Sequence, residues 1–290
     1  MDKNVYRKAL RKRLEAGELV CAPGVFDLVS ARITREFDFP AIYVTGFGLA
    51  ASAYGLPDAG ITGFTDMIGP ISRIADAATC PVIADADTGF GGLVNVRHTV
   101  QGYERAGVAA IQFEDQEFPK RCGHTGPRPV VSRDEMVSRV RVAVDARQDP
   151  DFVVIARSDA RLSEGFDAVV ARGQAYAEAG ADVVFLEALQ SEDEVARAIE
   201  AIGAPVMVNM VPGGASPTFA REALVRLGVG IAIFPTVSLM SAALAIRNAY
   251  AALSAGAEVA EIAGQMPFAE FQSMIGMADL QEFERRFAKP

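Results

Sequence analysis

The stretch Ala106-Gly107-Val108-Ala109-Ala110-Ile111-Gln112-Phe113-Glu114 combines the end of a helix, a buried strand and a carboxylate, in that order. Gly107 supplies the left-handed residue that commonly ends a helix. The apolar run from Ala109 to Phe113 has the length and composition of a buried strand. The pair Ala179-Gly180 stands in the same way ahead of another apolar run. Helix, glycine and strand therefore form a repeated unit, which predicts a parallel sheet.

Eight apolar runs of this kind occur along the chain, separated by segments with helical periodicity. They span Glu18–Cys21, Ala41–Val44, Pro81–Ala84, Ala109–Phe113, Phe152–Ala156, Asp182–Leu186, Pro205–Val208 and Gly230–Phe234. Eight strands in 290 residues predict an α/β fold of the (β/α)8 TIM-barrel type. An open doubly wound sheet is the alternative, but Asp85 and Asp87 precede the glycine-rich turn and would repel a bound phosphate.

The C-terminal part of the chain contains more helix than a barrel needs. Residues 1–290 are expected to form one barrel domain, with residues 255–290 as a helical extension. Helices are expected at Ser238–Ala252, Phe268–Met277 and Leu280–Phe287. Phe268, Phe271, Met274 and Ile275 form an apolar stripe at helical spacing, which is expected to pack on the barrel or on a partner subunit.

The composition favours a small-molecule enzyme in a reducing compartment. Asp and Glu total 37 against 28 Lys and Arg, so a net charge of -9 argues against nucleic acid and anionic membranes as partners. The cysteines Cys21, Cys80 and Cys122 have no paired spacing, which argues against disulfides and a cysteine zinc site. No secretory signal is recognisable, and no apolar run approaches the roughly 20 residues that span a bilayer. A cytoplasmic location is therefore expected.

Polar residues follow almost every predicted strand. They are Thr45 and Gly46, Asp85 and Asp87, Glu114, Arg157 and Asp159, Glu187, and Asn209, after strands two to seven respectively. A polar residue after one strand is often only a turn residue. In a parallel barrel, however, these positions share the C-terminal rim, where the active sites of this fold lie.

Four acidic residues on this rim form a candidate metal site. Asp85, Asp87, Glu114 and Asp58 offer oxygen atoms alone, which suit Mg²⁺ or Mn²⁺. Carboxylates gathered without a cation would repel one another. We therefore expect a divalent cation; the alternative is that Asp85 and Asp87 are ordinary turn residues.

The loop after the fourth strand carries the sequence Lys120-Arg121-Cys122-Gly123-His124. Lys120, Arg121 and His124, together with Arg157, offer positive charge to a substrate with carboxylates. The thiol of Cys122 can act as a general acid toward a carbanion, and Gly123 gives the loop flexibility. Taken alone, this segment is equally compatible with an exposed loop that happens to contain a cysteine.

Several motifs resemble the signatures of the isocitrate lyase and phosphoenolpyruvate mutase superfamily. They are Asp85-Ala86-Asp87-Thr88-Gly89-Phe90-Gly91, Glu114-Asp115-Gln116 and the Lys120–His124 string, with supporting similarity at 43–48, 55–58 and 156–160. The resemblance extends from about Pro23 to Pro235. The cysteine-containing string is similar to that of the carbon–carbon lyases, of the 2-methylisocitrate lyase and 2,3-dimethylmalate lyase type, and differs from that of the phosphonate mutases.

The resemblance implies a fold, an assembly and a set of roles. The last barrel helix would be exchanged between subunits of a homotetramer built as a dimer of dimers. Mg²⁺ would lie near Asp85 and Asp87, with Asp58 and Glu114 acting through water. The substrate would contact Tyr43, Thr45, Gly46, Phe47, Arg121, Gly123 and Asn209, and the catalytic residues would be Cys122, His124, Lys120, Arg157 and Glu187. A 2-hydroxy di- or tricarboxylate would yield a 2-oxo acid such as pyruvate and a second carboxylate, through a metal-stabilised enolate protonated by Cys122.

Two departures from the 2-methylisocitrate lyases bear on the substrate. Those enzymes usually carry glycine at the second position after Thr45, where this chain has Phe47. They carry Thr and Glu after strand seven, where this chain has Asn209-Met210-Val211-Pro212-Gly213-Gly214. This loop is more similar to that of the 2,3-dimethylmalate lyases, although Pro212 replaces an acidic residue. A narrower, less polar pocket favours a small alkyl-substituted malate over a tricarboxylate. The alternatives are oxaloacetate decarboxylation or hydrolysis, then a phosphonopyruvate-type mutase, and finally a ligand-binding barrel without catalysis.

Overall fold

The computed structural model describes residues 3–123 and 128–288, and eight parallel strands within them close into a barrel. The strands are β1 (Val20–Val25), β2 (Ile42–Val44), β3 (Val82–Asp85), β4 (Ala110–Glu114), β5 (Val153–Ser158), β6 (Val183–Leu186), β7 (Val206–Asn209) and β8 (Ile231–Phe234). Each strand pairs with its neighbours in sequence, and β8 pairs with β1. The predicted (β/α)8 barrel is therefore confirmed, and the open sheet is excluded.

Seven of the eight strands lie within two residues of the predicted bounds at either end, and β1 is the exception. The prediction ended this strand at Cys21 because Pro23-Gly24 resembles a turn. In the structure Gly24 pairs with Tyr43 inside the barrel wall. A Cβ atom on Gly24 would lie 2.4 Å from the Pro235 carbonyl oxygen. This glycine therefore permits a close approach of two backbones, and the strand continues through it.

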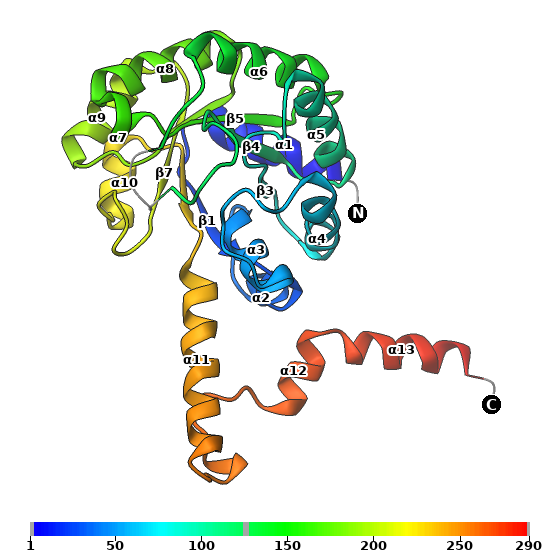
Figure 1. Ribbon diagram of the computed structural model, residues 1–290. Helices are drawn as coiled ribbons and strands as arrows, with labels where there is room; N and C mark the ends of the chain where they lie inside the picture. The colour runs from blue at the N-terminus through cyan, green and yellow to red at the C-terminus, as the bar shows by residue number, and fades with distance from the viewer. Residues whose placement is uncertain (1–2, 124–127, 289–290) are drawn as a thin grey trace.

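Helices surround the barrel on its outer face (Figure 1). They are α1 (Lys3–Glu15), α2 (Leu28–Ile33), α3 (Gly46–Tyr54), α4 (Phe64–Ala77), α5 (Leu93–Arg105), α6 (Arg133–Ala146), α7 (Arg161–Glu164), α8 (Phe166–Glu178), α9 (Glu192–Ala201) and α10 (Arg221–Leu227), with a 3-10 turn at Thr34–Glu36. Gly107 and Gly180 follow α5 and α8 with φ of +88° and +103°, as the glycine prediction requires.

Apolar side chains fill both the barrel and the layer between strands and helices. Inside the barrel, Ile83, Ile155, Phe185 and Met207 belong to one fully buried cluster. Outside it, the helices pack on the other faces of the same strands. Strands buried on both sides account for the continuous apolar runs in the sequence, and this rigid wall fixes the residues at its rim.

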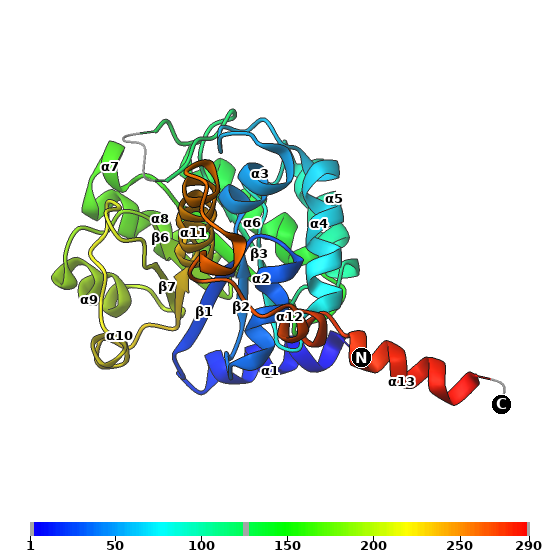
Figure 2. The same ribbon diagram turned by 90° about the horizontal axis from the view of Figure 1, so that it is seen from below.

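The last helices leave the barrel. Figure 1 shows α11 (Val237–Ser254) projecting from the barrel after β8, followed by α12 (Phe268–Met274) and α13 (Met277–Phe287), and Figure 2 shows α13 extending beyond the barrel. A 3-10 turn at Val259–Glu261 lies between α11 and α12. The three expected helices are thus present. None of their residues is buried, and Phe268 of the predicted apolar stripe is 78% exposed. Among the described helices, none has the length and apolar composition to cross a bilayer.

Candidate active site

A cavity of about 230 Å³ opens among the residues that follow the strands. Its lining includes thirteen of the predicted site residues: Tyr43, Thr45, Phe47, Asp58, Asp85, Glu114, Lys120, Arg121, Cys122, Gly123, Arg157, Glu187 and Asn209. Gly46 and Asp87 lie just behind this lining, where their backbone N–H groups donate to Asp85 over 3.3 and 3.1 Å. His124 lies outside the described residues. The sequence therefore located the cavity, while the roles of these residues stay predictions.

The acidic cluster already contains a cation. Lys120 Nζ lies 2.5 Å from Asp58 Oδ1 and 2.6 Å from Asp87 Oδ1, and its side chain is buried. Burial works against the charge of Lys120, but Asp87, Glu114, Asp85 and Asp58 raise its pKa well above the usual value. The inference that these carboxylates need a metal to relieve their repulsion was incomplete, because Lys120 provides a second counterion.

Two carboxyl groups of the cluster are poorly solvated. Burial is the largest influence on Asp87 and raises its pKa to about 6, against the opposing effect of Lys120. Burial likewise raises the pKa of Glu114 well above its usual range. Glu114 Oε1 is buried and has no hydrogen-bond partner within the described chain. A buried acceptor in this state fits a bound cation or a water that carries one.

The carboxylates of the acidic cluster fit Mg²⁺ better than they fit a metal ion that needs many direct protein ligands. All four side chains offer hard oxygen atoms. Within residues 3–123 and 128–288, however, no three acidic, histidine or cysteine side chains converge closely enough to ligate one ion directly. Mg²⁺ typically keeps several waters and contacts only one or two carboxylates. The arrangement therefore suits a hydrated Mg²⁺.

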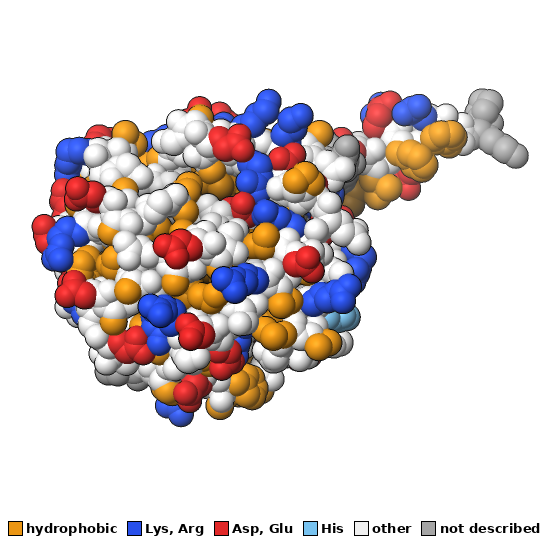
Figure 3. Space-filling model, turned by 90° about the horizontal axis from the view of Figure 1, so that it is seen from above, with side chains coloured by type: hydrophobic (Ala, Val, Ile, Leu, Met, Phe, Trp, Pro, Cys, Tyr) orange, Lys and Arg blue, Asp and Glu red, His pale blue; other side chains and the backbone are white. Residues whose placement is uncertain are grey.

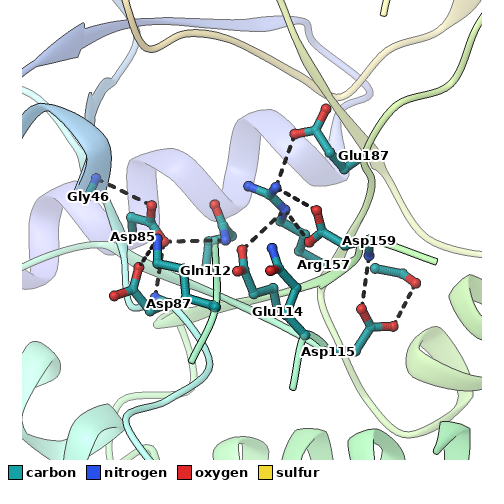
Figure 4. A network of polar contacts seen from close by, with 12 residues as sticks. Gly46, Asp85, Asp87, Gln112, Glu114, Asp115, Arg157, Asp159 and Glu187 are labelled. Carbon is teal, nitrogen blue, oxygen red and sulfur yellow. Dashed lines mark hydrogen bonds and ion pairs between the residues drawn. The ribbon is translucent and has the colours of Figure 1, made fainter. Parts of the chain in front are cut away.

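Arg157 stands at the centre of a second group of carboxylates (Figure 4). Its Nε and Nη2 donate to the two oxygens of Asp159 over 2.9 and 2.8 Å, and Nη2 lies 3.3 Å from Glu187 Oε2. Burial opposes the charge on Asp159, but Arg157 lowers the pKa of Asp159 below its usual value. We expected Arg157 to grip a substrate carboxylate with its fork. In the structure that fork is occupied by Asp159.

Three other predicted residues have structural contacts as well. The Tyr43 hydroxyl donates to Gln112 Oε1 over 2.6 Å, and burial raises the pKa of Tyr43 well above 10. Thr45 is the N-cap of α3, and its Oγ1 accepts from Gly48 N over 3.3 Å. Asn209 donates to Glu187 Oε2 over 3.1 Å. These contacts hold the walls of the cavity in fixed positions.

The loop that carries Cys122 lies across the cavity. Two hydrogen bonds of 3.0 Å join Gln116 to the backbone of Arg121, and Cys122 N donates to the Asp58 carbonyl over 3.1 Å. Gly123 lies so close to Arg157 that a Cβ atom would stand 2.4 Å from Arg157 Nη2. We predicted that Gly123 gives the loop flexibility. The structure adds a second reason for glycine at this position, because a side chain would clash with Arg157.

Sequence reasoning missed several residues of the site. Thr236, Pro235 and Met240 line the cavity, and Met240 comes from α11. Asp159 was noted at a strand end, but its pairing with Arg157 was not foreseen. The alternation of Arg157 and Asp159, two residues apart in an extended strand end, places both side chains on one face and was an available signal.

Comparison with known proteins gives a consistent family. The family model described as phosphoenolpyruvate phosphomutase matches residues 10–254. The chain is 43% identical to the 2,3-dimethylmalate lyase of Eubacterium barkeri, over 96% of this chain and 97% of that protein. It is 38% identical to the 2-methylisocitrate lyase of Escherichia coli, over 84% and 82% of the two chains.

Solved structures give the same result. An oxaloacetate acetylhydrolase bound to 3,3-difluorooxalacetate has a TM-score of 0.91 at 37% identity, covering 97% of both chains. A 2,3-dimethylmalate lyase of the PEP mutase/isocitrate lyase superfamily has a TM-score of 0.91 at 38% identity, covering 97% of this chain and 95% of its own. A phosphonopyruvate hydrolase with oxalate and Mg²⁺ has a TM-score of 0.88 at 33% identity, covering all of both chains. The chain therefore belongs to the PEP mutase/isocitrate lyase superfamily, as an enzyme of the carbon–carbon lyase type.

Proposed function

We propose that the protein is a Mg²⁺-dependent lyase that cleaves a 2-hydroxy dicarboxylate with alkyl substituents into a 2-oxo acid, such as pyruvate, and a second carboxylate. The observation that carries this proposal is the arrangement of one cavity. Its lining combines Cys122, Arg157 and three carboxylates of the acidic cluster with the apolar side chains of Phe47, Val211 and Pro212. A thiol suits carbanion protonation, and an apolar wall suits an alkyl group.

Asp85, Asp87, Asp58 and Glu114 would hold Mg²⁺, Asp58 and Glu114 through water. When bound, Mg²⁺ supplies Lewis acidity to the oxygens of a 2-hydroxy or 2-oxo carboxylate. The Mg²⁺ of the phosphonopyruvate hydrolase structure supports this assignment.

The protein's own groups account for the remaining chemistry. In the first turn of α3 the Gly46 and Gly48 N–H groups donate to Asp85 and Thr45, so the Phe47 N–H would be the backbone donor to a substrate carboxylate. Glu187, a carboxylate of the cavity lining, would accept the hydroxyl proton. Cleavage of the C2–C3 bond then turns the hydroxyl carbon into a ketone and leaves the electron pair on the departing carbon. Cys122 gives its proton to that carbon. The loop above the cavity keeps water from doing so.

An oxaloacetate-directed activity is the second candidate, supported by the likeness to oxaloacetate acetylhydrolase. A panel of 2,3-dimethylmalate, citramalate, 2-methylisocitrate, isocitrate, oxaloacetate and phosphonopyruvate, each with Mg²⁺, separates the candidates. We expect the highest kcat/KM for an alkyl-substituted malate. Fastest turnover of oxaloacetate, to oxalate and acetate or to pyruvate and CO₂, would overturn the proposal in favour of the second candidate. Fastest turnover of phosphonopyruvate would indicate a mutase.

We also propose that the enzyme works as a homotetramer, a dimer of dimers with helix exchange. The support is the exposed apolar surface of helices α11 and α13, which includes Leu244, Tyr250 and Phe283; Figure 3 shows hydrophobic side chains gathered along α13. Monomeric proteins rarely leave such surfaces uncovered. Sedimentation velocity should give about four times the chain mass, and a monomer at micromolar concentration would contradict the assembly.

The affinity for Mg²⁺ should depend on pH through Asp87. Its pKa of about 6 lies above the ordinary 3.8, so the group takes up a proton as the pH falls through 6. A protonated carboxyl binds a cation poorly, so affinity should fall about tenfold per pH unit below 6. Isothermal titration calorimetry between pH 5 and 7.5 measures this, and an affinity that is constant over that range would contradict the assignment of Asp87.

Substituting Gly123 with alanine should impair turnover without unfolding the protein. The new methyl group would have to displace the Arg157 guanidinium or lift the loop, and a displacement near 1 Å can cost about 100-fold in rate. Gly203→Ala is the matched control, because an added Cβ meets no atom within 4 Å there. Steady-state kinetics and thermal unfolding of both variants test the prediction. Equal kcat/KM in the two variants would show that the close approach has no catalytic consequence.

A further inference from the structure

Both backbone hydrogen-bonding groups of Cys122 are held. Cys122 N donates to the Asp58 carbonyl over 3.1 Å, and the Cys122 carbonyl accepts from Arg128 Nη1 over 3.1 Å. The two partners lie on opposite sides of Cys122 in the sequence: Asp58 precedes it, between α3 and α4, and Arg128 follows it. Fixing both peptide groups fixes the direction of the Cα–Cβ bond, which limits the thiol to the few positions that rotation about this bond allows.

Arg128 reaches Cys122 from a buried position. It is only 4% exposed, and its Nη2 lies 3.0 Å from Asp159 Oδ1. Arg128 is not among the residues that line the cavity. A buried guanidinium is costly unless it is paired with a carboxylate, and Asp159 is that carboxylate. Arg128 therefore forms an ion pair with Asp159 through Nη2 while its Nη1 donates to the Cys122 carbonyl.

Asp159 is itself firmly placed. Its backbone N–H donates to Asp115 Oδ1 over 2.9 Å, and its carboxylate is bidentate to Arg157. Asp115 in turn accepts from Ser158 Oγ and from the Tyr176 hydroxyl over 2.6 and 2.7 Å. Asp159 is thus anchored to the end of β5 and shared by two guanidinium groups, one at the base of the cavity and one in the loop.

From these contacts we propose that Arg128 is a positioning residue, which clamps the Cys122 carbonyl to the Asp159 anchor and so aims the thiol at the reacting carbon. This inference rests on the proposed function, because it assumes that Cys122 donates the proton. Asp159 then orients Arg157 through two hydrogen bonds and also fixes the Cys122 loop through its ion pair with Arg128. Lys120, bound to Asp58 and Asp87, holds the other side of the same loop.

Arg128→Ala should lower kcat about 100-fold, the cost of a misplaced proton donor, and change KM by less than about threefold. Added guanidinium ion should recover part of the lost kcat, because it can occupy the vacated site beside Asp159. Arg128→Lys keeps the charge but loses the fork, so it should fall between Arg128→Ala and the parent enzyme. Arg133→Ala is the matched control, since that side chain is 57% exposed and 3.8 Å from its nearest carboxylate, on Asp134.

A double-mutant cycle separates positioning from general structural support. In a Cys122→Ser background, Arg128→Ala should change the residual kcat by less than about threefold, because the thiol to be aimed is gone. A fall of similar size in both backgrounds would overturn the proposal. A kcat for Arg128→Ala within about twofold of that for Arg133→Ala would overturn it as well.

Hydrogen exchange gives a readout that needs no substrate. Loss of a charged hydrogen bond should speed exchange of the amides at 121–123 about tenfold in Arg128→Ala, with no change in Arg133→Ala. Unchanged exchange would overturn the clamp even if turnover falls. Should the parent enzyme cleave none of the acids in the panel, the proposed function fails, while faster exchange would still establish the clamp. Thermal unfolding of each variant confirms that it is folded.

Discussion

Substituting Cys122 with serine is expected to lower kcat for carbon–carbon cleavage by about 10²- to 10⁴-fold, the range that one general acid contributes. A serine hydroxyl has nearly the size of the thiol and can make the same kind of hydrogen bond, but it is a far weaker acid. In this variant the carbanion would be protonated by water, which is slower. The measurement is single-turnover formation of the 2-oxo acid from the best substrate of the panel, with Mg²⁺ affinity measured on the same variant.

The matched control is Cys21→Ser, because Cys21 is also half-buried but lies on β1 away from the cavity. Burial raises the pKa of the Cys21 thiol, which suits a packing residue. Turnover by this variant should equal that of the parent enzyme. Full activity in Cys122→Ser, with normal Mg²⁺ binding, would remove the thiol from the mechanism and leave the loop with a binding role alone.

The barrel could be predicted because its signals are local. Each strand is a continuous apolar run, and the glycines at 107 and 180 end helices by a backbone requirement that any sequence must meet. The error at β1 arose from a rule of the same local kind. Pro23-Gly24 has the composition of a turn, and only the approach of Pro235, more than 200 residues away, makes glycine the residue that continues the strand.

The sequence predicted where the site lies, but it did not predict which charged side chains pair with one another. Strand order alone places Asp85, Glu114 and Arg157 on one rim, since every strand of a parallel barrel ends on the same side. Which charge meets which depends on side-chain reach across the cavity. Lys120 reaches Asp87 across 33 positions of sequence, and Arg128 reaches Asp159 across 31. The sequence predicted that Arg157 offers positive charge at the rim, but it did not indicate that Arg157 is paired with Asp159.

In the C-terminal helices α12 and α13 the sequence predicted the secondary structure but not the packing. These helices follow from the local apolar periodicity at Phe268 and beyond, and they are present. That periodicity does not indicate what the apolar side chains of these helices pack against. Side chains that are exposed to solvent in one chain, such as Phe268 and Phe287, carry the same pattern as core residues, so sequence can indicate burial without indicating by what.

Asp87→Asn is expected to weaken Mg²⁺ binding about 10- to 100-fold and to reduce kcat/KM by about 10³-fold, since several kcal/mol of charge stabilisation depend on the metal. Asn is the informative substitution, because Asp87 has φ of +49° and asparagine tolerates that conformation well. Lys120 keeps Asp58 as its partner, so the loop should stay in place.

Two comparisons make the Asp87 prediction specific to its charge. Asp87→Ala removes the same charge but adds backbone strain at positive φ, so it should bind Mg²⁺ no better than Asp87→Asn and unfold at a lower temperature. Asp193→Asn, at a 76% exposed side chain, should match the parent enzyme. The decrease of Mg²⁺ affinity below pH 6 should also disappear in Asp87→Asn, because the group that titrates there is gone. If that pH dependence persists, another carboxyl of the cluster takes up the proton, and Asp87 would serve chiefly as the partner of Lys120.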